Sequence, residues 1–491
     1  MTNILIIGAG DAGRIILQEY QRRRRSDLIV GFLDDDPSKI GMKILGVTVL
    51  GSIDSIAQHI GDFSVTHIIV AMPSVKKSII KKIVSQVLAA DSSVNVYVVP
   101  EAEKFFDSVP ISPSLVESDF AEIFERDEYT INIDLIEEHY RNKTILITGA
   151  GGSIGSELCK QLLKFNVKKL VCVGRGEHSI YTLKKTINEY LDLMECKPEI
   201  ICRITDVKDQ FLLSKIFEET KPDIVFHSAA HKHVPLMEYN EIEAIQNNVI
   251  GTRNVLHCSY ENEISEFVLI STDKAVRPTN IMGATKRVAE LLTSYYHDHY
   301  GLNTAIVRFG NVVGSRGSVF HLFKEQIEKG GPVTVTHPEI TRFFMSISEA
   351  ALLVINAVAL SSGGEVFVLN MKEQFKIYDM AQKMIELYGY AAKQDVDIVI
   401  TELRPGEKMH EELFYNHNNV ITTQNDKIFI VQNEKEWYDE SSLLAFIEKF
   451  PIVKHELSST DIRYMIKKIV PEYEFSIDEH NATIDEMRFV N

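Results

Sequence analysis

The chain has 491 residues, of which 45% are hydrophobic and 25% charged, and its formal net charge is −17. This composition is that of a folded globular protein and excludes a disordered chain. The acidic balance argues against a general nucleic-acid binder, which needs a basic face to neutralise phosphates. The chain is too long for one ordinary hydrophobic core, so we expect two to four domains.

The cysteines and the hydropathy pattern indicate the compartment. The five cysteines are odd in number and form no Cys-x-x-Cys pair, which favours reduced, buried thiols. No uninterrupted apolar run approaches the roughly 18 residues that a membrane span requires. Met1 leads directly into an apolar segment, which leaves no room for a leader peptide. We therefore predict a cytoplasmic protein without a membrane span.

The chain opens with a strand, a glycine-rich turn and a helix. Residues 4–7 are apolar, the turn follows the pattern Gly-x-Gly-x-x-Gly, and a second strand at 28–33 ends at an acidic residue. Glycines let the backbone approach a phosphate and the acidic residue can bind a ribose, so this arrangement is typical of a dinucleotide site. The alternative is a Rossmann-like module that has lost its ligand or binds a different nucleotide. The candidate residues of this N-terminal nucleotide site are Gly8, Gly10, Gly13 and Asp34.

Two more apolar strands, at 67–71 and 94–99, predict that this first domain closes near residue 100. Residues 101–142 show weak periodicity and many acidic side chains. We interpret them as a connector with one or two short helices.

The same pattern starts again at residue 143. A strand at 143–148 leads into a Gly-x-x-Gly-x-x-Gly turn and a second helix, and strands and helices then continue to alternate. The glycines are Gly149, Gly152 and Gly155, and the later strands are expected at 169–173, 223–228, 266–271 and 304–308. The sequence thus predicts an α/β protein with two Rossmann-like doubly wound parallel sheets.

Polar residues gather after the predicted strand at 266–271. Ser271 to Ala275 follow this strand directly, where open α/β sheets place their ligands. A second group, Met282 to Lys286, opens a helix. A third group of arginines and polar residues lies further along the chain and comprises Arg308, Asn311, Arg342, Arg404 and Glu407.

These segments together resemble a known family. GAGGSIGSE, HSAAHKHVPLME, STDKAVRPTNIMGATK, RFGNVVGSRGSV, TRFFMS and LRPGEKMHEELF are similar to the UDP-N-acetylglucosamine 4,6-dehydratases of the extended short-chain dehydrogenase/reductase superfamily. The closer resemblance is to long polysaccharide-biosynthesis members, many of which begin with membrane helices that this chain lacks. It implies a nucleotide-binding-like domain at 1–100, the connector at 101–142, a catalytic domain with a C-terminal substrate-binding part at 143–415 and an extension at 416–491.

The reaction of such enzymes needs an acid and a base close together. Hydride leaves the sugar C4, the resulting ketone acidifies the C5 proton, water leaves from C5 and C6, and hydride returns to C6. The resemblance implies that Asp273 is the acid, Lys274 the base, and Thr272 the group that orients the C4 oxygen. Lys274 must then be neutral for part of the time, and we expect burial beside Lys286 and other cations to achieve this. A plain Asp273–Lys274 ion pair is the alternative.

Met282 stands where the superfamily normally has a tyrosine. Methionine cannot exchange protons, so the usual base for the C4 hydroxyl is absent. The long dehydratases are similar in having methionine there. Asp273, Lys274 or a water relayed through Thr272 are therefore the candidates for this base.

The resemblance also implies a tightly bound, recycled nicotinamide cofactor. Lys286 would bind the nicotinamide ribose. Arg175 could bind the 2′-phosphate of NADP, whereas the acidic Glu177 leaves NAD as the alternative cofactor. The other implied cofactor residues are Gly149, Gly152, Ser153, Ile154, Gly155, Asp206, Val207, Ala229 and Ala230.

Substrate residues follow from the same resemblance. Arg342 and Arg404 are candidates for the UDP diphosphate, because guanidinium groups match phosphate oxygens. Asn311 and Glu407 would contact the uridine or sugar, and His233 would lie in the wall of the site. No third ligand is spaced to make a metal site with His231 and His233, so no metal is predicted.

The sequence therefore predicts a 4,6-dehydratase that acts on a UDP-N-acetylhexosamine for surface polysaccharide or glycan precursor synthesis, and a homo-oligomer. A UDP-sugar 4-epimerase or reductase shares the fold, but would want the tyrosine that Met282 replaces. A non-catalytic nucleotide-sensing protein is the third hypothesis.

Overall fold

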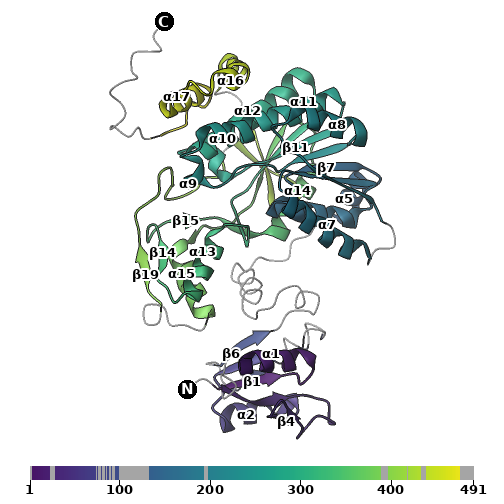
Figure 1. Cartoon of the computed structure of the whole chain (residues 1–491), viewed down its shortest axis with the longest axis vertical. Coiled ribbons are helices and arrows are strands. Elements are labelled where there is room, and N and C mark those ends of the chain that lie inside the picture. The colour runs from purple at the N-terminus through teal and green to yellow at the C-terminus, as the bar shows by residue number, and fades with distance from the viewer. Residues whose placement is uncertain are drawn as a thin grey trace. The chain divides into compact units, whose positions relative to one another are not determined.

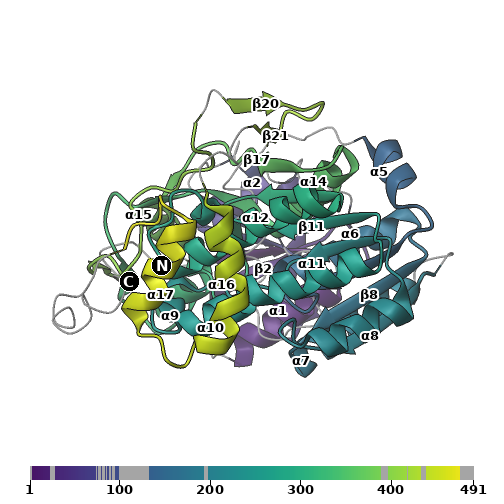
Figure 2. The same ribbon diagram turned by 90° about the horizontal axis from the view of Figure 1, so that it is seen from above.

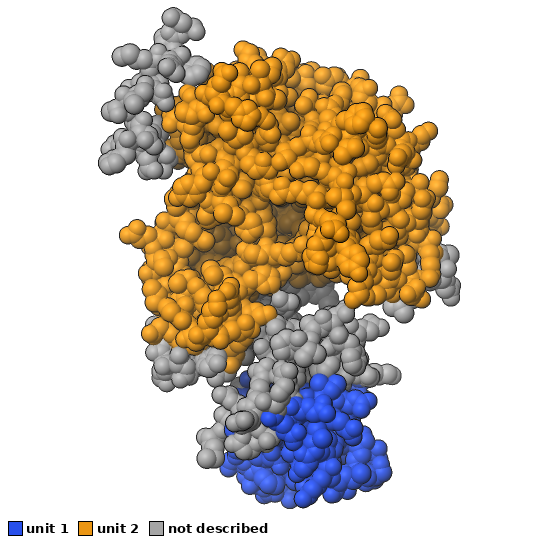
Figure 3. Space-filling model, in the orientation of Figure 1, with its two compact units in different colours: residues 1–123 blue, residues 124–491 orange. Residues whose placement is uncertain are grey.

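The computed structural model (Figure 1) has two compact units, residues 1–123 and 124–491 (Figure 3). Of the predicted connector, only residues 132–142 are described, and they hold helix α5 (Ile133–Tyr140). The residues that the structure describes are 3–22, 28–72, 75, 79, 83, 86–87, 90, 94–98, 132–192, 197–388, 396–416, 419–432 and 438–475.

Unit 1 contains a six-stranded sheet in the order β3-β4-β2-β1-β5-β6. Alternate residues of its central strand face two core clusters, with Leu5 and Ile7 in one and Ile4 and Ile6 in the other. Both faces of this strand are therefore covered, as a parallel sheet requires. Its elements are β1 (Ile4–Ile7), α1 (Asp11–Arg22), β2 (Ile29–Leu33), β3 (Lys43–Ile44), β4 (Val47–Gly51), α2 (Ile56–Asp62), β5 (His67–Val70) and β6 (Asn95–Val98).

Unit 2 contains a nine-stranded sheet in the order β20-β21-β17-β12-β11-β10-β7-β8-β9. The seven strands from β17 to β9 are parallel. The chain adds β8 and β9 on one side of β7 and then β10, β11 and β12 on the other, so the order of strand addition reverses between β7 and β10. Such a switch point is where open α/β sheets bind ligands. The strands are β7 (Thr144–Thr148), β8 (Lys169–Gly174), β9 (Glu199–Ile204), β10 (Ile224–His227), β11 (Glu266–Ile270), β12 (Thr304–Arg308), β17 (Glu365–Leu369), β20 (Val420–Thr422) and β21 (Ile428–Val431).

Helices cover both faces of the large sheet (Figure 1). On one face lie α5, α6 (Ser153–Leu162), α7 (Glu177–Asp192) and α14 (Ile347–Ala359); on the other lie α8 (Gln210–Thr220), α11 (Gly251–Glu261) and α12 (Ile281–Tyr300). Two sheets of this kind confirm the predicted fold class.

The C-terminal part of the chain adds strands and helices that the sequence patterns did not predict. Strand β21 extends the large sheet by pairing antiparallel with β17. Helices α16 (Glu440–Val453) and α17 (Ser459–Ile469) lie side by side on the outer side of α10 (Glu241–Ile245) and α12 (Figure 2). They bury Phe446, Phe450 and Ile466 in the core of unit 2, so this segment is part of that domain's packing.

A smaller subdomain faces the carboxyl ends of the parallel strands (Figure 1). It consists of short paired strands and two helices from segments on either side of β17. Its elements are β13 (Asn311–Val313), α13 (Val319–Glu328), β14 (Val333–Val335), β15 (Thr341–Arg342), β16 (Phe344–Ser346), β18 (Phe375–Lys376), α15 (Ile377–Leu387) and β19 (Ile398–Ile400).

The sequence also predicted the absence of a membrane span and reduced, buried cysteines. Among the described residues, no helix combines the length and apolar character that a membrane crossing needs. The described cysteines are free, with Cys159, Cys172 and Cys258 buried and Cys202 half-buried. Cys196 lies outside the described residues.

Candidate functional site

A cavity of about 690 Å³ lies between the large sheet and the smaller subdomain. Figure 3 shows that this face of unit 2 is hollowed there. The loops after β7, β10, β11 and β12 supply one side of the cavity, and residues 311–344 and 401–411 supply much of the other. The cavity therefore lies where the topology of the sheet predicts a ligand.

The cavity is electropositive although the chain is acidic. Its charged lining side chains comprise six cations and two carboxylates, namely Lys232, Lys274, Lys286, Arg316, Arg342 and Arg404 with Glu407 and Glu411. Because a low-dielectric cleft lined by one sign of charge concentrates ligands of the other, this lining favours an anionic ligand with several phosphates.

The loop after β7 forms a cradle for a phosphate. Gly149 has φ +65°, and a Cβ atom on it would lie 2.7 Å from the backbone of Ala229. A Cβ on Gly155 would lie 2.3 Å from the Gly149 carbonyl oxygen, so only glycine permits this close turn. Helix α6 begins after Gly152, which makes no side-chain cap bond, and its first turn lines the cavity. These residues fit a dinucleotide diphosphate at the helix N-terminus.

The predicted cofactor residues Ser153, Ile154, Gly155, Ala230 and Lys286 line the same cavity. The Lys286 ammonium donates to the Ile270 carbonyl oxygen at 2.7 Å. Burial lowers the pKa of Lys286 to about 8. This lysine thus lies at the end of β11, beside the position where the nicotinamide ribose is predicted.

Arg175, Asp206 and Val207 do not line the cavity. The Glu243 carboxylate lies 3.6 Å from the Arg175 guanidinium and 2.8 Å from the Lys208 ammonium, which is itself 3.6 Å from Asp206. Glu243, which the sequence analysis missed, therefore links two of the residues predicted for the adenine end. It also lies 3.0 Å from His231 Nε2.

A short turn at the end of β11 presents the predicted catalytic residues. The turn η6 (Asp273–Ala275) begins at Thr272, whose hydroxyl donates to Asp273 Oδ1 at 2.9 Å. The Lys274 ammonium lies 3.0 Å from the same Asp273 oxygen and 3.1 Å from Asn311 Oδ1. A Cβ on Gly283 would lie 2.2 Å from the Lys274 carbonyl oxygen, so this glycine lets α12 pack against the turn.

The electrostatic setting expected for Lys274 was wrong. Burial alone lowers the pKa of Lys274, but the carboxylates of Asp273 and Glu411 outweigh it and raise the pKa above its ordinary value. The Glu411 carboxylate lies 3.6 Å from the Lys274 ammonium. The two carboxylates therefore favour the charged form of this lysine, whereas the predicted base must be neutral for part of the time.

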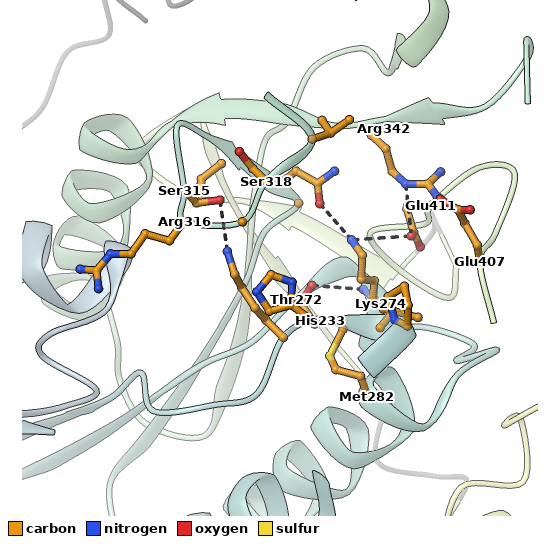
Figure 4. Close-up of a pocket in the computed structure, with 18 of the residues that line it drawn as sticks. His233, Thr272, Lys274, Met282, Ser315, Arg316, Ser318, Arg342, Glu407 and Glu411 are labelled. Atoms are coloured by element: carbon orange, nitrogen blue, oxygen red, sulfur yellow. Dashed lines mark hydrogen bonds and ion pairs between the residues drawn. The ribbon is translucent and has the colours of Figure 1, made fainter. Parts of the chain in front are cut away.

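Asp273 and Met282 occupy different depths of this site. The Asp273 side chain is fully buried and does not line the cavity, whereas Thr272 and Lys274 do. Met282, in the first turn of α12, is buried and lines the cavity on the side of Thr272 and Lys274 (Figure 4). No proton-exchanging side chain stands at this position.

The predicted substrate residues come together opposite this turn. Arg342 Nη2 lies 3.4 Å from Glu407 Oε1, and Arg404 Nη2 lies 3.3 Å from the same oxygen. His233 and Asn311 line the cavity as well. All five residues thus belong to the cavity that contains Lys274.

Three charged lining residues carried no predicted role, although each lies within a quoted motif. Lys232 donates to Ser315 Oγ at 3.3 Å, and Arg316 donates to the Gly151 carbonyl at 2.5 Å, extending away from Lys274 (Figure 4). Glu411 follows the predicted Arg404 and Glu407 in LRPGEKMHEELF. Only their position in the motifs could have indicated them, because lone charged residues are usually solvated.

The predicted nucleotide residues of unit 1 also lie together. Gly8 has φ +102°, and a Cβ on Gly13 would lie 2.1 Å from the Gly8 carbonyl oxygen. Asp34 Oδ2 accepts from the Ala9 amide at 2.7 Å and lies 3.1 Å from the Lys39 ammonium. The carboxylate predicted to bind a ribose is therefore engaged by the glycine-rich turn itself.

The sequence matches two known families. A family described as a polysaccharide biosynthesis protein matches residues 145–433, and one described as a CoA-binding domain matches residues 1–100. Together the two matched ranges follow the division into two nucleotide-binding-like folds.

Individual proteins and one solved structure are also similar to this chain. The chain is 43% identical over 425 residues to capsular polysaccharide biosynthesis protein CapD of Staphylococcus aureus, covering 86% of this chain and 69% of that protein. It is 31% identical over 327 residues to a UDP-N-acetylglucosamine 4,6-dehydratase (inverting) of Campylobacter jejuni, covering 65% and 92% of the two chains. The X-ray structure of Pen from Bacillus thuringiensis is similar with a TM-score of 0.55 and 33% identity, covering 60% of this chain and 91% of that one.

Proposed function

Because this chain belongs to the polysaccharide biosynthesis protein family, we propose that it is a 4,6-dehydratase that acts on UDP-N-acetylglucosamine. The chain is an enzyme of the dehydratase and epimerase type. The observation that supports the finer assignment is the Thr272–Asp273–Lys274 turn, of which Thr272 and Lys274 line the same cation-rich cavity as the glycine loop after β7. The product would be the 4-keto-6-deoxy hexosamine, a precursor for surface polysaccharide.

Different residues of the cavity would bind different parts of the substrate. Arg342 and Arg404 would bind the UDP diphosphate, since guanidinium groups pair with phosphate oxygens at two points. Asn311, Glu407 and His233 would contact the uridine or the sugar. The sugar would then reach the turn at the end of β11.

NAD or NADP would lie on the glycine loop of α6, with Lys286 at the nicotinamide ribose. The chemistry that this cofactor would supply when bound is reversible hydride transfer, from the sugar C4 and back to C6. The chain's own residues must handle the protons. Thr272 Oγ1 donates to Asp273 Oδ1, so a proton from the C4 hydroxyl can reach the buried carboxylate through Thr272. This route takes the place of the tyrosine that Met282 replaces.

The proposal is tested by the product. Purified protein incubated with UDP-N-acetylglucosamine, without added cofactor, is expected to give a product whose proton NMR spectrum shows a C6 methyl doublet. An intact C6 hydroxymethyl group with altered C4 stereochemistry would instead identify an epimerase. Unchanged substrate would favour a non-catalytic nucleotide-sensing protein.

Arg404→Ala is expected to weaken substrate binding more than catalysis. Loss of a charge-assisted hydrogen bond of about 1.5 to 3 kcal/mol corresponds to a KM increase of about 10- to 100-fold with little change in kcat. Arg277→Ala is the matched control, because Arg277 is an exposed arginine that pairs with Glu412 outside the cavity. An unchanged KM in the Arg404 variant would remove this residue from the diphosphate site.

Three features of the sequence analysis stay predictions. These are a homo-oligomeric state, cytoplasmic localisation, and nucleotide binding at the glycine-rich turn of unit 1. Calorimetric titration of the full chain with UDP-N-acetylglucosamine, before and after Gly13→Val, would test the last of these.

A further inference from the structure

The connection between β13 and α13 contacts the glycine loop on the opposite side of the cavity. We call residues 315–318 of this connection the strap, and all four line the cavity. The Arg316 amide donates to Ser153 Oγ at 3.1 Å, and the Arg316 guanidinium donates to the Gly151 carbonyl oxygen at 2.5 Å. The smaller subdomain and the glycine loop after β7 are therefore joined at this point.

The strap also contacts the loop after β10. The Lys232 ammonium donates to Ser315 Oγ at 3.3 Å. Gly317 has φ +68°, and a Cβ atom on it would lie 2.5 Å from His233 Cε1, so only glycine permits this packing. Because β7 and β10 are neighbours in the sheet, the strap contacts both loops that flank the switch point.

Two cations lie together at the strap without a counterion. Lys232 and Arg316 both line the cavity, and their hydrogen-bond partners are a hydroxyl and a carbonyl oxygen. Within the described part of the chain, neither side chain pairs with a carboxylate. Burial and the nearby Arg316 charge lower the pKa of Lys232, which agrees with this unbalanced positive charge. Such a pair favours a bound anion.

The position of Arg316 indicates which diphosphate this anion belongs to. The Arg316 guanidinium lies on the glycine loop at the start of α6, where a dinucleotide diphosphate fits. Figure 4 shows the Arg316 side chain pointing away from Arg342, which is a candidate for the UDP diphosphate. The diphosphate of the cofactor is therefore within reach of Arg316, at the opposite end of the site from that of UDP.

We propose that the strap retains the dinucleotide cofactor, and that Arg316 does so by binding the cofactor diphosphate. This inference rests on the proposed dehydratase function, because an enzyme that returns its hydride to the sugar must keep one cofactor bound from oxidation to reduction. Release of the cofactor then requires the strap to break its contacts with both loops. The cofactor is retained by the substrate-binding side of the cavity as well as by the glycine loop.

Arg316→Gln tests the role of the charge. Bound nicotinamide nucleotide is expected to dissociate about 10- to 100-fold faster, because one charge-assisted hydrogen bond to a phosphate is lost. The purified protein is diluted into excess ADP-ribose as a competitor, and the nucleotide that stays bound is separated by gel filtration and quantified by chromatography. The UDP affinity measured by calorimetry should stay within about threefold of that of the unmodified protein, since other arginines bind that diphosphate.

Gly317→Ala tests the strap without removing its charge. The added methyl group would meet the His233 ring, and the positive φ is unfavourable for alanine, so the strap cannot keep its contact with the loop after β10. Cofactor release should be faster by about fivefold or more, the effect of a strained backbone position. Lys329→Ala is the matched control, because Lys329 is an exposed lysine on α13 that pairs with Glu325 outside the cavity. Its cofactor release should differ by no more than about twofold.

Three results would overturn the inference. The first is an Arg316→Gln variant that retains its cofactor as long as the unmodified protein does. The second is a loss of UDP affinity with unchanged cofactor release, which would assign Arg316 to the substrate. The third is an unmodified protein that is purified without bound nicotinamide nucleotide. If the cofactor is retained as expected but no C6 methyl product forms, the proposed function alone fails.

Discussion

Lys274→Ala is expected to lower the dehydration rate by about 10⁴-fold, the upper end of what a positioned acid or base contributes. This lining side chain contacts Asp273, Asn311 and Glu411 together. Its loss removes the group that the family resemblance assigns as the base of the elimination and leaves the buried Asp273 carboxylate without its cation. Measurement of product by NMR, with UDP affinity by calorimetry, separates this loss from a loss of binding.

Two further variants make the result decisive. Lys274→Gln retains a polar group beside the two buried carboxylates, so it guards against misfolding and should be as inactive as the alanine variant. Lys376→Ala removes an exposed lysine that pairs with Glu339 outside the cavity, and should keep full activity. A turnover rate above about one tenth of normal in Lys274→Gln would contradict the role of Lys274 in the elimination.

Glu290→Ala is expected to destabilise the protein by about 3 to 5 kcal/mol, the cost of removing one partner of a buried ion pair. Glu290, in α12, is 1% exposed and accepts from Arg308 through two nitrogens, each at 2.7 Å. It also accepts from Arg287 at 3.1 Å and from the Ser271 hydroxyl at 2.6 Å. Because Ser271 precedes Thr272, this network also holds the end of β11 in place. Urea unfolding of the variant measures the loss.

The same carboxylate predicts a pH dependence of stability. Burial alone would raise the pKa of Glu290, but Arg308 and Arg287 lower it from 4.5 to about 2. A carboxylate with a lowered pKa stabilises the fold fully above its ordinary pKa, and this stabilisation is lost as the pH falls through about 2. The difference in unfolding free energy between the unmodified protein and Glu290→Gln should therefore shrink between pH 4.5 and pH 2.

Glu325→Gln provides the comparison for this stability experiment. Glu325 pairs with Lys329 on α13, and both side chains are more than half exposed. Surface pairs of this kind contribute little to stability, because water and salt screen them. If Glu290→Ala costs no more than Glu325→Gln, the buried network does not hold β11 and the catalytic turn.

The local sequence by itself determined the two nucleotide-binding folds and the end of β11. Apolar strands bounded by glycine turns are set by neighbouring residues, so the strands predicted at 143–148, 223–228 and 266–271, which the structure shows as β7, β10 and β11, could be read within single segments. The same holds for the Thr272–Asp273–Lys274 turn, where three functional groups follow one another in the chain.

Only the tertiary structure decided what surrounds that turn. Lys274 belongs to the end of β11, Asn311 to β13 and Glu411 to the segment after β19, and no local pattern links them. The sign of the Lys274 pKa shift depends on Glu411, because a buried lysine is neutral or charged according to the carboxylates that the fold brings to it. Helix α17 likewise packs on α12, and α16 packs on α17, so the place of this pair depends on a contact between segments distant in the chain.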